Sequence, residues 1–417
     1  MVKVSGLSRS PFARPKVLAA LLVVAVIFLA AAAWPGGEVG YGDADSPAAH
    51  APATHAAALQ PRPRPRPNLR ARQAARRALA AARARRRRAL PINVYRAMTT
   101  RRLSARVRGV PQRLYVPNSG DGTLDVINPA TGRVIRRFTV GSIPHHVTPS
   151  WDLRWLYVDN TASSTLTVIA PRTGLPVRTL QVSDPYNLYF TPDGRQAVVV
   201  AERYQQLDFR NPHTWRLIAT TRIPAAGPDH LDFSADGRSL LISAEWSGRV
   251  FRVDVRRHRV TGSVNVGGLP VDVKIAPDGS VYYVANQGRG GVSLIDARSL
   301  RAIAFLPTGQ GAHGLCVSRD GHLLYVSNRL AGTISVIDFA ERRVVARWDV
   351  GGSPDMMQIS TDGLRLWVSN RFSASVSEID ADNGRVVRTI PVGASPHGLA
   401  LFPQPGRFSI GHNGVYR

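Results

Sequence analysis

A segment of about 42 residues recurs seven times in this chain of 417 residues, and it constrains the possible folds more than any other feature. Each copy opens on an apolar run that ends in a polar residue, as in Leu324-Tyr325-Val326-Ser327-Asn328. The seven runs begin at positions 114, 156, 198, 241, 282, 324 and 366, so their spacing stays between 41 and 43 residues. Self-similarity at a fixed period predicts one structural unit that is repeated and stacked.

Each copy divides into four short segments that are apolar or that alternate apolar and polar residues. In the sixth copy these segments are 324–327, 333–337, 344–350 and 355–359. Four strands rich in β-branched residues within about 42 positions are typical of a propeller blade. Asp-Gly pairs, which supply the positive φ of tight hairpins, precede a new copy five times. The sequence therefore predicts an all-β fold, a seven-bladed β-propeller over residues 114–417.

The two ends of the repeat array predict how the ring closes. The last inner segment, residues 396–402, has no outer strands after it, and the first copy, residues 114–140, has no clear inner strand. We therefore expect 396–402 to complete the blade that begins at 114, which removes the open edge. Residues 407–417 weakly resemble a further outer strand, so a partial eighth blade remains a second interpretation.

The copies resemble the β-propeller family named for a Tyr-Val-Thr-Asn motif, which occurs in bacterial and archaeal surface proteins. The motif reads Tyr-Val-Ser-Asn at 325–328, Trp-Val-Ser-Asn at 367–370 and Tyr-Val-Ala-Asn at 283–286. The third and fourth copies depart from it, because Glu202 and Glu245 stand at the Asn position. The members of this family differ in function, so the resemblance implies the fold and no particular activity.

The N-terminal residues have the pattern of an export signal. Four basic residues precede an uncharged apolar run at 17–33, which as a helix would span about 26 Å. This length is marginal for a membrane span, and the run ends in three alanines that would suit cleavage. We expect residues 1–34 to be a signal peptide or, by slight preference, a single-pass membrane anchor. Either way the propeller is expected outside the cytoplasm, at the cell membrane or secreted.

Residues 35–113 read as a linker rich in Pro, Ala and Arg that is largely disordered. Alternating proline at 61–67 favours an extended spacer, and residues 62–88 contain twelve arginines. Residues 1–113 carry +19 of the formal net charge of +26, so the basicity belongs mainly to this arm. We expect the arm to bind anionic lipid or a cell-wall polymer, or to act as a solvated spacer. No nucleic acid is expected, because an exported arm would not ordinarily meet it.

Several common kinds of enzyme site are missing from the sequence. No Ser-His-Asp arrangement, Walker loop or dinucleotide-binding glycine motif stands in a suitable context. Cys316 is the one cysteine, so no intrachain disulfide can form. It lies in an apolar strand and is interpreted as a core residue.

One face of the predicted propeller gathers polar side chains around the mouth of the central channel. They head the inner strands, where neutral imidazoles and carboxylates could hold a borderline metal ion. The alternative is that the repeated Pro-His turns only orient the backbone. The ligand-binding candidates of this set are His145, His146, Tyr186, Asp229, His230, Asp272, His313, Asp355 and His397.

A second set of residues on the same face follows the next strand of each blade. Its Asn and Glu residues are expected to cap the loops that follow. Four further side chains of this set are ligand-binding candidates: Arg203, Trp246, Arg329 and Arg371.

The metal hypothesis names four histidines and a divalent transition metal as the cofactor. The four are His145, His230, His313 and His397, and His145 with His397 is the best pair because closure makes their blades adjacent. Histidines of neighbouring blades are favoured, and His313, two blades from His397, is expected to need a long reach or a bridging water. The leading functional hypothesis is a binding module for a protein, a glycan or a small ligand. The alternative is a metal-dependent lyase, hydrolase or oxidoreductase at the histidine ring.

Overall fold

The computed structural model describes residues 73–74, 77–80 and 93–417. The predicted signal or anchor at 1–34 lies outside the described residues, as does most of the predicted linker at 35–113. Across the part of the chain that is described, no helix is both long enough and apolar enough to cross a membrane.

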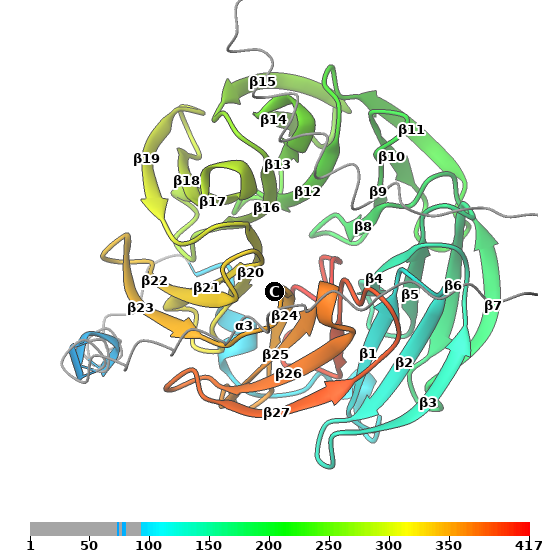
Figure 1. Ribbon diagram of the computed structural model, residues 1–417. Coiled ribbons are helices and arrows are strands. Elements are labelled where there is room, and N and C mark those ends of the chain that lie inside the picture. The colour runs from blue at the N-terminus through cyan, green and yellow to red at the C-terminus, as the bar shows by residue number, and fades with distance from the viewer. Residues whose placement is uncertain (1–72, 75–76, 81–92) are drawn as a thin grey trace, which may run out of the picture. The chain divides into compact units, whose positions relative to one another are not determined.

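Seven antiparallel sheets of four strands each are arranged in a ring, which confirms the seven-bladed propeller (Figure 1). Blades are numbered here from the one that contains β1. Blade 1 holds β28 (Ala400–Phe402), β1 (Arg113–Asn118), β2 (Thr123–Asn128) and β3 (Arg133–Thr139). Blade 2 holds β4 (Pro144–Pro149), β5 (Leu156–Asn160), β6 (Thr165–Ala170) and β7 (Leu175–Gln181). Blade 3 holds β8 (Asn187–Phe190), β9 (Ala197–Ala201), β10 (Gln206–Arg210) and β11 (Leu217–Arg222).

The other four blades repeat this order from the inner to the outer strand. Blade 4 holds β12 (Pro228–Phe233), β13 (Ser239–Ala244), β14 (Arg249–Asp254) and β15 (Arg259–Asn265). Blade 5 holds β16 (Pro270–Ile275), β17 (Val281–Asn286), β18 (Gly291–Asp296) and β19 (Ala302–Pro307). Blade 6 holds β20 (Ala312–Val317), β21 (Leu323–Asn328), β22 (Thr333–Asp338) and β23 (Arg343–Asp349). Blade 7 holds β24 (Pro354–Ile359), β25 (Arg365–Asn370), β26 (Ser375–Asp380) and β27 (Val386–Pro391).

Helices are short and lie at the ends of the blades. The single α-helix in residues 93–417 is α3 (Arg96–Thr99). The 3-10 helices of these residues are η2 (Ala105–Val107), η3 (Glu245–Ser247), η4 (Gln287–Arg289) and η5 (Arg371–Ser373).

We call the face on which the inner strands begin the upper face of the propeller, and the opposite one the lower face.

Closure of the ring follows the prediction. Strand β28 pairs with β1 in the register Arg113–Phe402, Leu114–Leu401 and Tyr115–Ala400. Strands from the first and the last repeat therefore meet in blade 1, and no blade lacks its inner strand.

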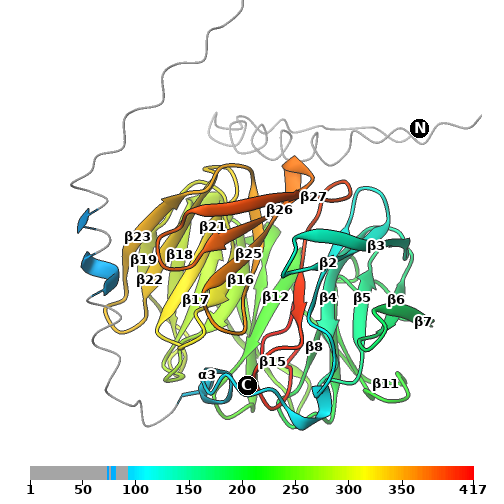
Figure 2. The same ribbon diagram turned by 90° about the horizontal axis from the view of Figure 1, so that it is seen from below.

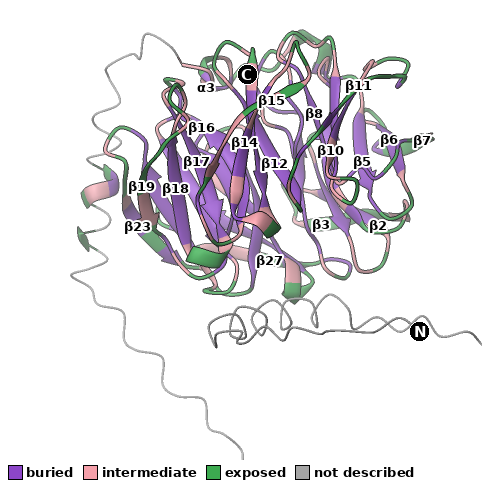
Figure 3. Ribbon diagram, turned by 90° about the horizontal axis from the view of Figure 1, so that it is seen from above, coloured by how far each residue is buried: buried purple, intermediate pink, exposed green. Residues whose placement is uncertain are grey.

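The core lies between the blades, and burial decreases from the channel outward. Strands β16 and β17 are buried along their whole length, whereas most of β3 is exposed. Figure 3 shows the same distribution, with buried residues in the inner and middle strands and exposed residues in the loops. The inner strands are therefore rigidly held, and the polar residues that head them have fixed positions.

Residues 407–417 form no eighth blade, which corrects the second interpretation of the tail. They form a hairpin that enters the channel from the lower face, and the C-terminus marks the centre of the ring in Figure 1. The backbone N–H of Ile410 donates to the Val415 carbonyl at 2.9 Å, and that of Phe190 in β8 donates to the Ile410 carbonyl at 2.9 Å. The tail thus adds to the short inner strand of blade 3 and not to the outside of the ring.

Part of the predicted linker packs on the lower face of the channel. The Tyr95 hydroxyl donates to the Ile275 carbonyl at 2.9 Å, and Tyr95 is completely buried. Met98 in α3 is buried beside it. Figure 2 shows α3 and the C-terminus at the same face. Residues of the predicted linker, Tyr95 and Met98 among them, therefore belong to the packed body, although its predicted start was at 114.

Candidate metal centre

Histidine rings from several blades meet at the upper end of the channel. The ring centroids of His146 in blade 2 and His230 in blade 4 are 5.2 Å apart, and those of His313 in blade 6 and His397 before β28 are 5.8 Å apart. The expectation that neighbouring blades are favoured was too narrow, because His146 and His230 lie two blades apart. Side chains as long as imidazoles span the channel, and the C-terminal hairpin narrows it further.

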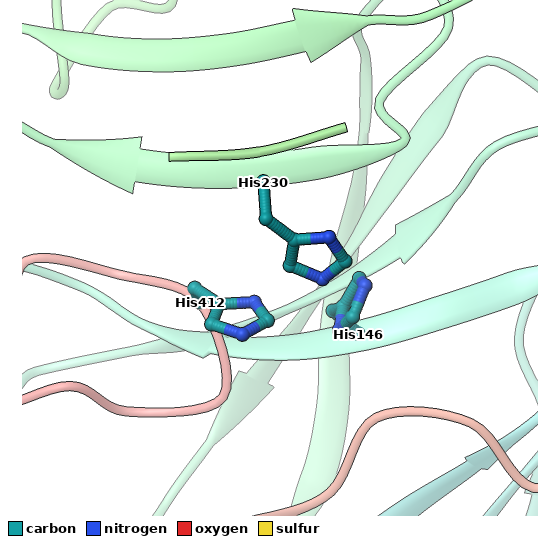
Figure 4. A group of neighbouring side chains, drawn as sticks. All are labelled: His146, His230 and His412. Carbon is teal, nitrogen blue, oxygen red and sulfur yellow. The ribbon is translucent and has the colours of Figure 1, made fainter. Parts of the chain in front are cut away.

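Three buried imidazoles form the first group that could hold a metal ion: His146, His230 and His412. One nitrogen from each ring lies within 4.8 Å of the other two. The rings come from β4, β12 and the tip of the C-terminal hairpin, and they face one another in Figure 4. Three imidazole ligands at about 2.0–2.1 Å from an ion would place their nitrogens about 3–4 Å apart. A small inward movement of the rings would reach that geometry.

An oxygen atom lies beside the Nδ1 atom of each of these rings. An acceptor at Nδ1 favours the tautomer that carries its proton there, which leaves Nε2 as the free lone pair. The three contacts are His146 Nδ1 to Asn413 Oδ1 at 3.0 Å, His230 Nδ1 to Asp229 Oδ1 at 2.5 Å, and His412 Nδ1 to Asn187 Oδ1 at 3.3 Å. Nε2 has no hydrogen-bond partner in His146 and in His230, and the contact of His230 Nδ1 with Asp229 is a close ion-pair approach without hydrogen-bond geometry.

Burial keeps two of the three rings in the neutral form that binds metals. It lowers the pKa of His146 well below its usual value and the pKa of His412 to about 3. In His230 burial acts in the same direction, but the adjacent Asp229 carboxylate outweighs it and raises the pKa. A metal ion at Nε2 of the protonated ring would have to displace the Nε2 proton to solvent, while the Nδ1 proton stays between the ring and the Asp229 carboxylate.

The second group consists of His313, Asp355 and His397, whose potential ligand atoms also lie within 4.8 Å of one another. Here the carboxylate already has a cation, because Arg329 Nη2 lies 2.5 Å from Asp355 Oδ1. His313 Nδ1 lies 2.9 Å from the same oxygen. Arg329 and His313 outweigh the effect of burial and hold the pKa of Asp355 well below its usual range. A metal ion would compete with Arg329, so the three-imidazole group is the better site.

Among the four predicted metal ligands, His145 has a different environment. Its Nδ1 lies 3.0 Å from Thr161 Oγ1, and its ring lies 5.0 Å from that of His397. The structure thus brings the predicted pair together, but it places His146, and not His145, in a group of converging nitrogen atoms. His145 is half-buried and lies 4.9 Å from the Tyr186 ring, so both form an outer layer above the three buried rings.

The other predicted site residues lie around the mouth or below it. Asp272 is fully buried and pairs with Lys274 at 2.8 Å, while its second oxygen lies 3.7 Å from His412 Nε2. Arg203 pairs with Asp184 at 2.7 Å. Trp246 donates from Nε1 to Glu202 Oε1 at 3.1 Å.

Sequence reasoning missed His412 and its neighbour Asn413. The segment Gly411-His412-Asn413-Gly414 carried a signal, because His and Asn tolerate the left-handed region that tight hairpins need. In the structure His412 and Asn413 have φ values of 39° and 48°. The sequence could have indicated a hairpin here, but not that the hairpin enters the channel.

A family model described as a YNCE-like beta-propeller matches residues 76–405. A search of curated proteins gives no match. Hydrazine synthase of Kuenenia stuttgartiensis is 21% identical over 64% of this chain and 92% of its own, with a TM-score of 0.57. A functionally unknown protein from Desulfotomaculum acetoxidans DSM 771 is 18% identical over 69% of this chain and 98% of its own, with a TM-score of 0.59. A putative 6-phosphogluconolactonase from Bacteroides uniformis ATCC 8492 is 18% identical over 70% of this chain and 99% of its own, with a TM-score of 0.58. These likenesses show the fold alone.

Proposed function

The chain belongs to the YNCE-like beta-propeller family, and its fold alone specifies no activity. From the residues in the channel, we propose that the protein binds a divalent transition-metal ion through His146, His230 and His412. One observation carries this proposal. Three buried imidazoles from three separate parts of the chain converge to within 4.8 Å. Burying polar rings is unfavourable unless a partner compensates, and a shared ion would satisfy their free nitrogens.

The donor set indicates which ions would bind. Three imidazoles suit Zn²⁺, Cu²⁺, Ni²⁺ and Co²⁺ better than the oxygen-seeking Mg²⁺ and Ca²⁺. Three protein ligands leave one coordination position open, as in metal sites that exchange a water molecule or a small ligand. The C-terminal hairpin and Tyr95 fill the lower end of the channel. A ligand of the metal ion would therefore exchange through the upper mouth of the channel.

The proposal places this binding module outside the cytoplasm, as the apolar run at 17–33 and its basic flank favour. The arginine-rich arm would hold the propeller at an anionic lipid surface or cell-wall polymer. Binding of the full chain to vesicles that contain phosphatidylserine should then fall steeply between 50 and 500 mM salt, roughly as screening predicts. Binding that ignores salt would contradict this role of the arm.

A metal-dependent hydrolase is the second candidate, and one residue favours it. Burial, followed by the Asp229 charge, raises the pKa of Glu202 to about 7, which suits a general base near neutral pH. Any hydrolytic activity of the metal-loaded protein should then be lost in Glu202→Gln while the metal content is unchanged. Activity that survives this substitution would remove Glu202 from the mechanism.

Metal titration tests the main proposal. We expect the full chain, stripped with EDTA, to bind one Zn²⁺ in a competition titration with a chromophoric chelator. His146→Gln and His412→Gln should each weaken binding by more than about 100-fold, since each removes a ligand and outer-shell changes alone cost 10–100-fold. His213→Gln is the matched control, because His213 is exposed and outside both groups. Equal affinity in all four proteins would contradict the proposal.

A further inference from the structure

Arg371, at the mouth of the channel, carries a positive charge that no acidic group of the described residues matches. Its side chain is 23% exposed, and its one ion-pair contact is from Nη1 to Asp355 Oδ2 at 3.9 Å. That Nη1 atom is buried and has no hydrogen-bond partner. Asp355 already forms a closer ion pair with Arg329 at 2.5 Å. The charges of Asp355 and Arg329 balance each other, so Arg371 has no carboxylate of its own.

A second unpartnered group lies beside the same carboxylate. His397 is 3% exposed, and its Nδ1 atom has no hydrogen-bond partner. Its Nε2 atom lies 3.7 Å from Asp355 Oδ2, the oxygen that also faces Arg371. Because an acceptor at Nε2 favours the tautomer that carries its proton there, Nδ1 is the lone pair of this ring. Arg371 is therefore the group that offers hydrogen-bond donors to an anion.

The acidic groups across the mouth have other partners: Trp246 Nε1 donates to Glu202 Oε1 at 3.1 Å, and Gln287 Nε2 donates to Glu245 Oε1 at 3.4 Å. Burial, followed by the Asp229 charge, raises the pKa of Glu245 well above its usual value, which disfavours its charged form. Asp229 itself faces His230 at 2.5 Å, and Asp272 pairs with Lys274 at 2.8 Å. Neither carboxylate lies within ion-pair distance of Arg371. Asp355, already paired with Arg329, is the one carboxylate of the described residues that reaches Arg371, at 3.9 Å.

Large apolar side chains surround this charge on the upper face. Three of them lie two residues after the second strand of their blade: Trp246, Leu330 and Phe372, which are 42%, 65% and 62% exposed. Tyr204, which is 51% exposed, lies three residues after β9. Phe372 follows Arg371 directly, and the Arg329 guanidinium carbon lies 5.9 Å from its ring centroid. A ligand with an anionic end and an apolar body would match both features.

We propose that the mouth of the channel binds an organic carboxylate, whose oxygens pair with Arg371 and whose apolar part lies against Phe372. A planar carboxylate matches the guanidinium fork, and a ligand hydrogen bond to a desolvated arginine is stronger than one between neutral groups. The site needs no metal ion. A cation bound by His146, His230 and His412 would strengthen it by adding positive charge beneath the ligand.

Three small probes test the proposal in the wild-type chain, by calorimetric titration of EDTA-treated protein. Benzoate carries both features, acetate carries the charge alone, and benzamide is a neutral analogue of nearly the same shape. We expect benzoate to bind at least tenfold more tightly than either of the others. Equal affinities for benzoate and benzamide would overturn the proposal, and this comparison needs no variant.

Substitutions then assign the contact. Arg371→Gln should remove the preference for benzoate over benzamide, and Arg371→Lys should keep part of it. Arg238→Gln is the control with the same change of net charge, because the Arg238 side chain is 89% exposed and lies on the lower face. Benzoate binding that Arg371→Gln leaves unchanged would overturn the assignment.

The same titration of zinc-loaded protein keeps the two proposals separable. Tighter benzoate binding with zinc than without it supports the added charge beneath the ligand. If no zinc binds, the metal proposal fails, and the carboxylate site still stands or falls on the metal-free result.

Discussion

At the level of single residues, the contact between Asp229 and His230 tests whether the histidines act as ligands. The Asp229 carboxylate lies 2.5 Å from His230 Nδ1 and would orient the ring without touching the ion. We expect Asp229→Asn to weaken zinc binding by about 10–100-fold, as outer-shell changes do in other metal sites. Asp349→Asn is the control, because Asp349 is exposed on β23. Zinc affinity that is equal in the two variants would exclude this supporting role.

Asp159 in β5 predicts how stability depends on pH. It is fully buried, its Oδ1 has no hydrogen-bond partner, and its Oδ2 accepts one bond from Thr148 at 3.3 Å. Burial raises its pKa well above the usual 3.8. Below pH 3.8 the folded and unfolded chains both carry this proton. Above pH 3.8 only the unfolded chain loses it, so the free energy of unfolding falls by about 1.4 kcal/mol per pH unit until the pKa of the folded state is reached.

Asp159→Asn should therefore stabilise the protein at pH 7, because it removes the loss of about 1.4 kcal/mol per pH unit that comes from ionisation of the unfolded chain. The gain should shrink as the pH falls toward 4. Chemical denaturation at several pH values measures both effects. A gain that is independent of pH, or a loss of stability at pH 7, would contradict the assignment of Asp159 as a neutral buried acid.

The sequence predicted which strand ends carry the site, but not which of two adjacent histidines points inward. Alternation along a strand would place His145 and His146 on opposite sides. The pairing of β4 with β5 is irregular between Pro144 and Val147, so alternation cannot be extrapolated through this segment. The choice between the two rings depends on that bulge, and a bulge follows from packing that a sequence pattern does not contain.

At the level of elements, the C-terminal hairpin supplies His412 and depends on a close approach to β8. Gly411 has a φ of 101°, and a Cβ atom there would lie 2.5 Å from the Tyr189 Cα. We expect Gly411→Ala to displace the hairpin and to weaken zinc binding by more than tenfold, because His412 would no longer reach the other two rings. Zinc titration and thermal unfolding measure the two consequences.

The chain offers a matched control for this substitution. Gly351 also has a positive φ, of 70°, but a Cβ atom there would meet nothing within 4 Å. Gly351→Ala should cost about 1–2 kcal/mol of backbone strain and leave zinc binding unchanged. If the two alanine variants bind zinc equally well, the position of the hairpin does not determine the metal site.

Closure by β28 was predictable, whereas the position of the tail was not. The repeat shows directly that the first copy, which starts at 114, lacks an inner strand. It also shows that the last inner segment, residues 396–402, has no outer strands after it. The hairpin belongs to no repeat, and its partners are Asn187, His146 and Asp232, which contact His412, Asn413 and Arg417. Such contacts over more than 180 residues of sequence leave no periodic trace.

At the level of the whole molecule, the ring acts as a scaffold whose axis is its functional part. The blades repeat almost regularly, but the residues that head their inner strands differ from blade to blade. Stability comes from the features that repeat, and the candidate site comes from those that do not. This division explains why seven copies could be counted from the sequence while the grouping of six histidines near the axis required the structure.

Anomalous X-ray diffraction from zinc-soaked crystals of the chain tests the central claim most directly. Data collected above and below the zinc absorption edge locate the ion independently of any assumed ligands. We predict a single strong peak at about 2.0–2.1 Å from one nitrogen each of His146, His230 and His412. A peak between His313, Asp355 and His397 instead, or no peak in the channel, would contradict the account.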